Sequence, residues 1–123
     1  MSAVLALTQQ LIRCPSITPN DAGCQQIIAD RLKKIGFHIE PMRFEEVDNL
    51  WTRFGTEAPL MVFAGHTDVV PTGPLDAWNS NPFEPTLREE YLYGRGATDM
   101  KSGLAALVAV SYTHLRAHET LRY

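Results

Sequence analysis

The chain has 123 residues, of which 45% are hydrophobic and 20% charged, and its formal net charge is −3. This is typical of one globular domain with its own core. The balance of charge gives no basic footprint for nucleic acid, and no apolar stretch approaches the ~18 residues that a membrane span requires. The N-terminus lacks the basic region of a signal peptide. We therefore expect a cytoplasmic protein that binds neither nucleic acid nor membranes.

Two helices are predicted at the N-terminal end. Apolar residues recur at helical spacing over residues 4–12, and a second apolar stripe runs over residues 24–35. Between them, Asn20 or Asp21 is placed to accept N–H groups from the first turn of the second helix. Gly36 is a natural C-terminal stop for that helix.

Three strand candidates follow these helices. Residues 37–40 alternate between apolar and polar side chains, residues 49–54 form a second candidate, and residues 59–66 contain a continuous apolar run. A continuous run indicates a strand that is covered on both faces, as in a sheet between helices. We expect an α/β fold, part of a three-layer sandwich in which a mixed, mostly parallel sheet is flanked by helices.

The rest of the chain contains a loop, a strand and a helix. Residues 71–85 form a proline-rich loop, and residues 90–94 form a short strand that leads into a glycine-containing turn. Residues 100–110 predict a helix that is apolar nearly all round and therefore buried. Two cations near this turn, Arg95 and Lys101, are expected to pair with nearby carboxylates.

Three side chains are candidates for metal chemistry. His66 and Asp68 end the third strand candidate, and Asp99 follows 33 residues after His66. Ligands of α/β sheets bind outside the carboxyl ends of the strands, so His66 and Asp99 are expected to meet in one crevice. A neutral imidazole binds zinc well when a second group holds its other nitrogen, a role that suits Asp68. Taken alone, these residues also fit a turn-capping aspartate and a plain helix N-cap.

The sequence motifs are more specific when they are combined. The stretches "LTQQLIRCPSITPNDAGCQ", "GHTDVVPTG", "NPFEPT" and "LYGRGATDMKSG" occur in this order. Over residues 3–110 the chain resembles the dinuclear zinc aminoacylase/carboxypeptidase family. The resemblance implies that His66 is a ligand of one zinc, that Asp68 is a catalytic residue orienting His66, and that Asp99 bridges two zinc ions. It also implies a cis peptide after Asp99, and two Zn²⁺ per active site in the complete enzyme, with Co²⁺ as a possible substitute.

The same resemblance implies a function. The expected reaction is metal-dependent hydrolysis of the amide bond of N-succinyl-LL-2,6-diaminopimelate, a small-molecule substrate, to succinate and LL-2,6-diaminopimelate in lysine and diaminopimelate biosynthesis. The opening stretch favours this activity over the acetylornithine deacetylase and aminoacylase activities of the same family. A non-catalytic α/β binding module is the alternative from another class.

The resemblance also divides the chain. Residues 1–110 are expected to be the N-terminal part of the catalytic domain, whereas residues 111–123 do not resemble the family and are expected to be foreign or frayed. The complete enzyme is expected to form a homodimer through a domain that this sequence lacks. A downstream Glu-Glu pair and a late histidine that the family requires are also missing. We therefore expect this chain to be a truncated, inactive part of the enzyme.

Overall fold

A computed structural model describes the backbone of residues 2–121 and the side chains of residues 2–115. None of the helices in this part of the chain is both long and apolar enough to span a membrane. In chain order, the elements are α1 (Ala3–Ile12), α2 (Cys24–Lys33), β1 (His38–Phe44), β2 (Val47–Arg53), a 3-10 helix (Leu75–Ala77), β3 (Thr86–Arg88), β4 (Tyr91–Tyr93), a π-helical turn (Ala97–Lys101) and α3 (Ser102–Leu121).

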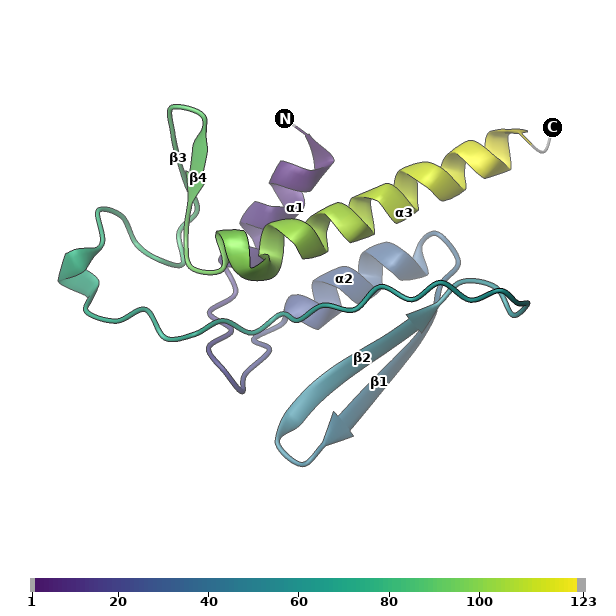
Figure 1. Ribbon diagram of the computed structural model, residues 1–123, viewed down its shortest axis with the longest axis horizontal. Helices are drawn as coiled ribbons and strands as arrows, with labels where there is room; N and C mark the ends of the chain where they lie inside the picture. Colours follow the sequence, from purple (N-terminus) through teal and green to yellow (C-terminus); the bar gives the residue numbers. More distant parts are fainter. Residues whose placement is uncertain (1, 122–123) are drawn as a thin grey trace.

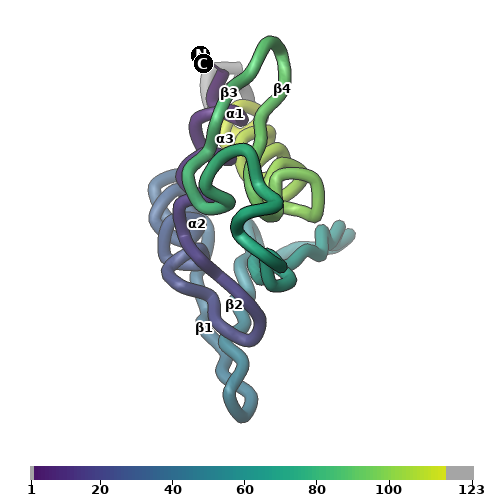
Figure 2. The backbone as a smooth tube through the Cα atoms, turned by 90° about the vertical axis from the view of Figure 1, so that its left-hand side faces the viewer, coloured from purple at the N-terminus to yellow at the C-terminus, as the bar shows by residue number. Residues whose placement is uncertain are grey.

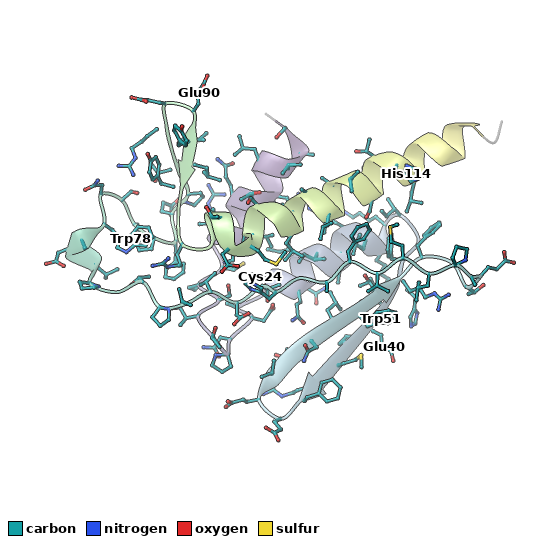
Figure 3. All side chains as sticks on the ribbon, in the orientation of Figure 1. Cys24, Glu40, Trp51, Trp78, Glu90 and His114 are labelled. Carbon is teal, nitrogen blue, oxygen red and sulfur yellow. The ribbon has the colours of Figure 1, made fainter. Side chains whose placement is uncertain are left out.

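The core lies where the three helices meet (Figure 1). It is built from the apolar faces of α1, α2 and α3: Leu7, Leu11, Cys24, Ile28, Leu32, Ala105 and Val108. Figure 3 shows Cys24 near the middle of this arrangement, where α2 approaches α3. Burying a leucine side chain stabilises a fold by ~1.5–3 kcal/mol, so the leucines of α1 and α2 hold the helices together. The two predicted N-terminal helices are confirmed.

Helix α3 differs from the prediction in its burial. Ala105 is fully buried and Val108 is 6% exposed, whereas Val110 is 56% exposed. The expectation of a helix buried nearly all round is wrong, because α1 and α2 contact only one of its faces. The helix also continues to Leu121. It therefore crosses the predicted boundary at residue 110, and that boundary stays a prediction.

The strands form two separate antiparallel hairpins. Strand β1 pairs with β2, with His38 opposite Arg53, and β3 pairs with β4, with Thr86 opposite Tyr93. The hairpins lie at opposite ends of the molecule (Figure 2). The α/β class is confirmed. Within residues 2–121 the parallel pairing is limited to an isolated bridge between Ile17 and Val69, so the mostly parallel sheet of the expected three-layer sandwich stays a prediction.

The apolar segment 59–66 is extended but forms no strand. It runs beside α2 and α3 as the teal trace of Figure 1. Its side chains are open to solvent, with Met61 78% and Phe63 61% exposed. The prediction of a strand covered on both faces is wrong for this segment, because no other strand of the described chain pairs with it. Its carboxyl end nevertheless carries His66 to the candidate site.

Candidate metal centre

Three segments converge on the candidate site. They are residues 16–21, between α1 and α2, residues 66–69, and the π-helical turn Ala97–Lys101. The first two lie side by side, because the amide of Val69 donates to the carbonyl of Ser16 (2.8 Å) and the hydroxyl of Ser16 donates to the carbonyl of Thr67 (2.8 Å). A histidine at the end of an extended segment is thereby fixed by backbone contacts rather than by a sheet.

The ring of His66 is held by both of its nitrogens. Its Nδ1 lies 2.9 Å from the main-chain carbonyl of Asp68, and its Nε2 lies 3.0 Å from Oδ1 of Asp99. A carbonyl oxygen only accepts hydrogen bonds, so Nδ1 must carry a proton and donate. In a neutral ring Nε2 then presents its lone pair to Asp99, which is the tautomer that binds a metal through Nε2.

This arrangement places two acceptors against each other. The lone pair of His66 and the carboxylate of Asp99 approach to 3.0 Å only with a proton or another cation between them. Partial burial lowers the pKa of His66, but hydrogen bonds to the Asp68 carbonyl and to the Asp99 carboxylate raise it more, so the net pKa lies above its ordinary value. The pair therefore attracts positive charge.

Asp99 lies inside the π-helical turn and does not cap a helix. Its φ of −122° and ψ of 94° are not helical, and the turn begins after Gly96, which has a φ of +85°. Because Met100, the next residue, is not helical either (φ −136°, ψ 32°), no helix begins directly after Asp99, and the plain N-cap alternative is wrong. The Asp99–Met100 peptide is cis, as the resemblance implied. The side chain of Asp99 is 84% exposed and projects from the turn toward His66.

Asp68 contacts His66 mainly through its backbone. Its carboxylate Oδ1 lies 3.4 Å from Nδ1 of His66, farther than its own main-chain carbonyl at 2.9 Å. The other carboxylate oxygen, Oδ2, accepts a hydrogen bond from the hydroxyl of Thr18. The structure thus brings His66, Asp68 and Asp99 together, whereas their roles as ligands and as orienting residue stay predictions.

Two contributors to the site were missed in the sequence. Thr18 holds the carboxylate of Asp68, and Asp21 accepts the hydroxyl of Thr67 at 2.6 Å. Asp21 also accepts the amide of Gln25 in the first turn of α2 at 3.0 Å, which confirms its predicted contact with that turn. A Thr and an Asp between two helices signal a turn, but they do not signal which distant segment the turn contacts.

The site opens into two neighbouring cavities. A cavity of about 270 Å³ lies over the glycine-containing turn 94–99, and a larger one of about 580 Å³ extends between α2, β2, residues 60–68 and α3. Thr18, His66 and Asp68 line both of them. The smaller cavity contains all three predicted site residues, whereas Asp99 does not line the larger one. The three predicted site residues therefore share the smaller cavity.

The donor set fits a divalent metal but does not complete its coordination. An imidazole nitrogen and a carboxylate oxygen are ordinary zinc ligands, and two ligand atoms of one tetrahedral zinc lie ~3.3 Å apart. The observed 3.0 Å between His66 and Asp99 is close to that separation. In the described residues, no cluster of three or more His, Cys, Asp or Glu side chains is arranged to hold a metal. A zinc that was bound here would require further ligands.

The two cations near the site do not behave as predicted. Lys101 is fully buried, and its Nζ donates to the carbonyls of Leu11 (2.7 Å) and Cys14 (2.9 Å), so its hydrogen-bond partners in the described chain are carbonyls rather than carboxylates. Burial lowers the pKa of this lysine. Arg95 lies over the ring of Trp78, 5.0 Å from its centroid. Figure 3 shows Trp78 in the loop on the left. The expected pairing with carboxylates is therefore wrong for both cations in the described part of the chain.

Comparison with known proteins identifies similar sequences. Residues 62–122 match the family described as peptidase family M20/M25/M40. The chain is 61% identical over 117 residues to a succinyl-diaminopimelate desuccinylase of Acinetobacter baumannii (strain SDF), which covers 95% of this chain and 31% of that protein. It is 58% identical over 118 residues to the protein of that name from Thioalkalivibrio sulfidiphilus (strain HL-EbGR7), covering 96% of this chain and 31% of that protein. The chain thus spans about a third of the length of these curated relatives.

Proposed function

Because the chain belongs to peptidase family M20/M25/M40, we propose that a protein carrying it at the length of its relatives is a metal-dependent amide hydrolase. The substrate we propose is N-succinyl-LL-2,6-diaminopimelate, which is cleaved to succinate and LL-2,6-diaminopimelate in lysine and diaminopimelate biosynthesis. Identity of 61% to a succinyl-diaminopimelate desuccinylase supports this choice of substrate. The observation that carries the proposal is the facing pair of His66 Nε2 and Asp99 Oδ1.

His66 and Asp99 would hold the metal in this account. Zinc, or cobalt in its place, would supply activation of a water and polarisation of the scissile carbonyl, with two ions in the complete site. The Asp68 carbonyl holds the proton on Nδ1 of His66, so the lone pair of Nε2 stays directed at the metal position. Thr18 restrains the Asp68 carboxylate beside the ring. Asp99 would bridge the two ions, which needs a carboxylate open to the cavity, as its exposed side chain is.

The wider setting follows from the same proposal. The partner is a small-molecule substrate rather than nucleic acid or a membrane, and the enzyme acts in the cytoplasm. It forms a homodimer through a domain outside this chain. Residues of that remaining part would supply the ligands that complete the site, among them a glutamate pair and a late histidine.

A protein of the relatives' length that contains this chain provides the test. It is expected to hydrolyse N-succinyl-LL-2,6-diaminopimelate, to lose activity with a chelator and to regain it with Zn²⁺ or Co²⁺. His66→Ala and Asp99→Ala are each expected to lower kcat/KM by about 1,000-fold or more, because a catalytic metal contributes several kcal/mol. The exposed histidine of β1, His38, supplies a matched control in His38→Ala.

The outcomes separate the candidate functions. Faster hydrolysis of N-acetylornithine would make the enzyme a deacetylase of the same family. Metal-independent binding of a ligand, with no hydrolysis of any N-acyl amino acid, would replace the enzyme by a binding module.

A further inference from the structure

We propose that Lys101 is a positioning residue, which holds Asp99 against His66 by anchoring the turn Ala97–Lys101 to the C-terminal end of α1. The inference rests on the proposed metal-binding role of His66 and Asp99. It concerns a residue that lies outside the site cavity and contacts neither of those two side chains through its ammonium group.

The anchor is a buried cation between carbonyl groups. The side chain of Lys101 has no solvent exposure, and its Nζ donates to the carbonyls of Leu11 at 2.7 Å and Cys14 at 2.9 Å. Carbonyls at the C-terminal end of a helix carry partial negative charge and attract cations. If this enclosed ammonium group moved, the two carbonyls or the ammonium group itself would lose their hydrogen-bond partners, which is unfavourable in a buried site. Lys101 therefore fixes its own backbone relative to α1.

That backbone is the end of the turn that carries Asp99. The amide of Lys101 donates to the carbonyl of Gly96 at 2.9 Å, which closes the turn around Asp99. The Asp99 side chain is 84% exposed, so packing around the carboxylate does little to hold it. Its place opposite His66 is consequently set by the turn, and Lys101 fixes one end of that turn.

The turn also reaches the backbone of the histidine segment. The amide of His66 donates to the sulfur of Met100 at 3.4 Å. The terminal methyl of Met100 lies 3.0 Å from the position that a Cβ on Gly65 would take. Met100 is thus a reporter for the approach of the two segments, and it reports without any metal.

The experiment combines this reporter with metal uptake. The chain, labelled with ¹³C at its methionine methyls, is compared with Lys101→Leu, which removes the donors, and with Lys101→Arg, which restores donor groups. Lys33→Leu, an exposed lysine of α2, is the matched control. We expect wild type and Lys33→Leu to give nuclear Overhauser contacts from the Met100 methyl to Gly65 and the His66 amide. Lys101→Leu is expected to lose these contacts, and Lys101→Arg to recover them at least in part.

Calorimetric titration with Zn²⁺ gives the second reading. Loss of an outer partner of a metal ligand weakens affinity by about 10- to 100-fold, and we expect this range for Lys101→Leu and no change for Lys33→Leu. A lysine that only stabilised the fold would lower the urea midpoint without moving either reading in the folded variant. If Lys101→Leu does not fold, Lys101→Gln, which keeps one donor on a shorter side chain, is judged by the same two readings.

The two proposals fail in different ways. Met100 contacts that persist in the folded Lys101 variant would overturn the anchoring role, whatever the metal does. Zinc uptake that is absent in wild type, or unaffected by His66→Ala and Asp99→Ala, would instead refute the metal site of this chain, while the Met100 contacts still decide whether Lys101 holds the turn.

Discussion

His66 Nε2 and Asp99 Oδ1 lie 3.0 Å apart, although 33 positions separate the two residues in the sequence. The contact is made from two sides. The main-chain carbonyl of Asp68 sets the ring of His66, and a π-helical turn anchored by Lys101 presents Asp99. The ring of His66 and the carboxylate of Asp99 are both positioned by backbone geometry. Loss of a neighbouring side chain should therefore weaken metal binding less than loss of His66 or Asp99 itself.

Asp68→Ala should weaken zinc binding far less than His66→Ala does. The alanine variant keeps the main-chain carbonyl that accepts from Nδ1 of His66 at 2.9 Å and loses only the carboxylate at 3.4 Å. We expect an affinity loss of about 10-fold, the lower end for an outer partner of a ligand, measured by calorimetry. Asp30→Ala, on the exposed face of α2, is the control. Uptake abolished as fully as in His66→Ala would show that the carboxylate is itself a ligand.

Thr18→Val should lower the free energy of unfolding. It should also weaken zinc binding, because the Asp68 carboxylate beside His66 is no longer held in place. Valine keeps the shape of threonine but removes the hydroxyl that donates to Asp68 Oδ2. A hydrogen bond to a charged group contributes about 1.5–3 kcal/mol. Because this contact is exposed to solvent, we expect a loss at the lower end of that range in the free energy of unfolding in urea. The control is Thr86→Val in the distant β3, where the hydroxyl of Thr86 donates to the carbonyl of Glu84. It is expected to leave zinc affinity unchanged. Equal zinc affinity of Thr18→Val and wild type would remove Thr18 from the site.

Gly96→Ala should cost more stability than Gly55→Ala. Both glycines have a positive φ, +85° and +80°, so both substitutions strain the backbone. A Cβ on Gly96 would also lie 2.5 Å from Cγ1 of Val69, whereas one on Gly55 meets nothing within 4 Å. We expect Gly96→Ala to lose about 1–3 kcal/mol more than Gly55→Ala in urea unfolding. Recovery of stability in the double variant Gly96→Ala/Val69→Ala would show that the clash is with Val69. Equal losses of stability in Gly96→Ala and Gly55→Ala would disprove the clash.

Stability should fall with rising pH through the titration of Cys24. Burial raises the pKa of this thiol to about 11, above the ordinary value that it has in the unfolded chain. Below the pKa that the thiol has in the unfolded chain, both states keep the proton, and the contribution of Cys24 to the free energy of unfolding is complete. This contribution is lost as the pH rises through the pKa of the thiol in the folded state. Two pKa units correspond to at most ~3 kcal/mol. Urea unfolding at pH 8.5 and 10.5 should show a larger drop for wild type than for Cys24→Ala, and identical drops would contradict it.

The sequence predicted the local elements better than their pairing. The helices 4–12 and 24–35 follow from apolar periodicity, and the structure has both, because a helix needs only its own backbone hydrogen bonds. Segment 59–66 has the composition of a buried strand, but a strand needs a neighbour, which the described chain does not provide. Composition could not reveal this absence.

At the candidate site, too, the sequence predicted which residues are involved better than it predicted their contacts. The spacing of His66 and Asp68 predicted a ring with a partner, yet the sequence does not tell a main-chain carbonyl from a carboxylate as that partner. Lys101 was expected on a carboxylate, and its burial against α1 depends on contacts with residues 87 and 90 positions away. Contacts of this range are set by tertiary packing, which no local pattern records.

Zinc titration of a protein of the relatives' length that carries this chain is the most direct test of the shared metal site, with His66→Ala, Asp99→Ala and the control His38→Ala followed by calorimetry. If His66 and Asp99 share a metal, wild type and His38→Ala take up Zn²⁺ with the same affinity, while each of the other two variants loses more than the about 100-fold that is the upper end for an outer partner of a ligand. Uptake that is missing in wild type, or equal in all four proteins, would refute a metal shared by His66 and Asp99.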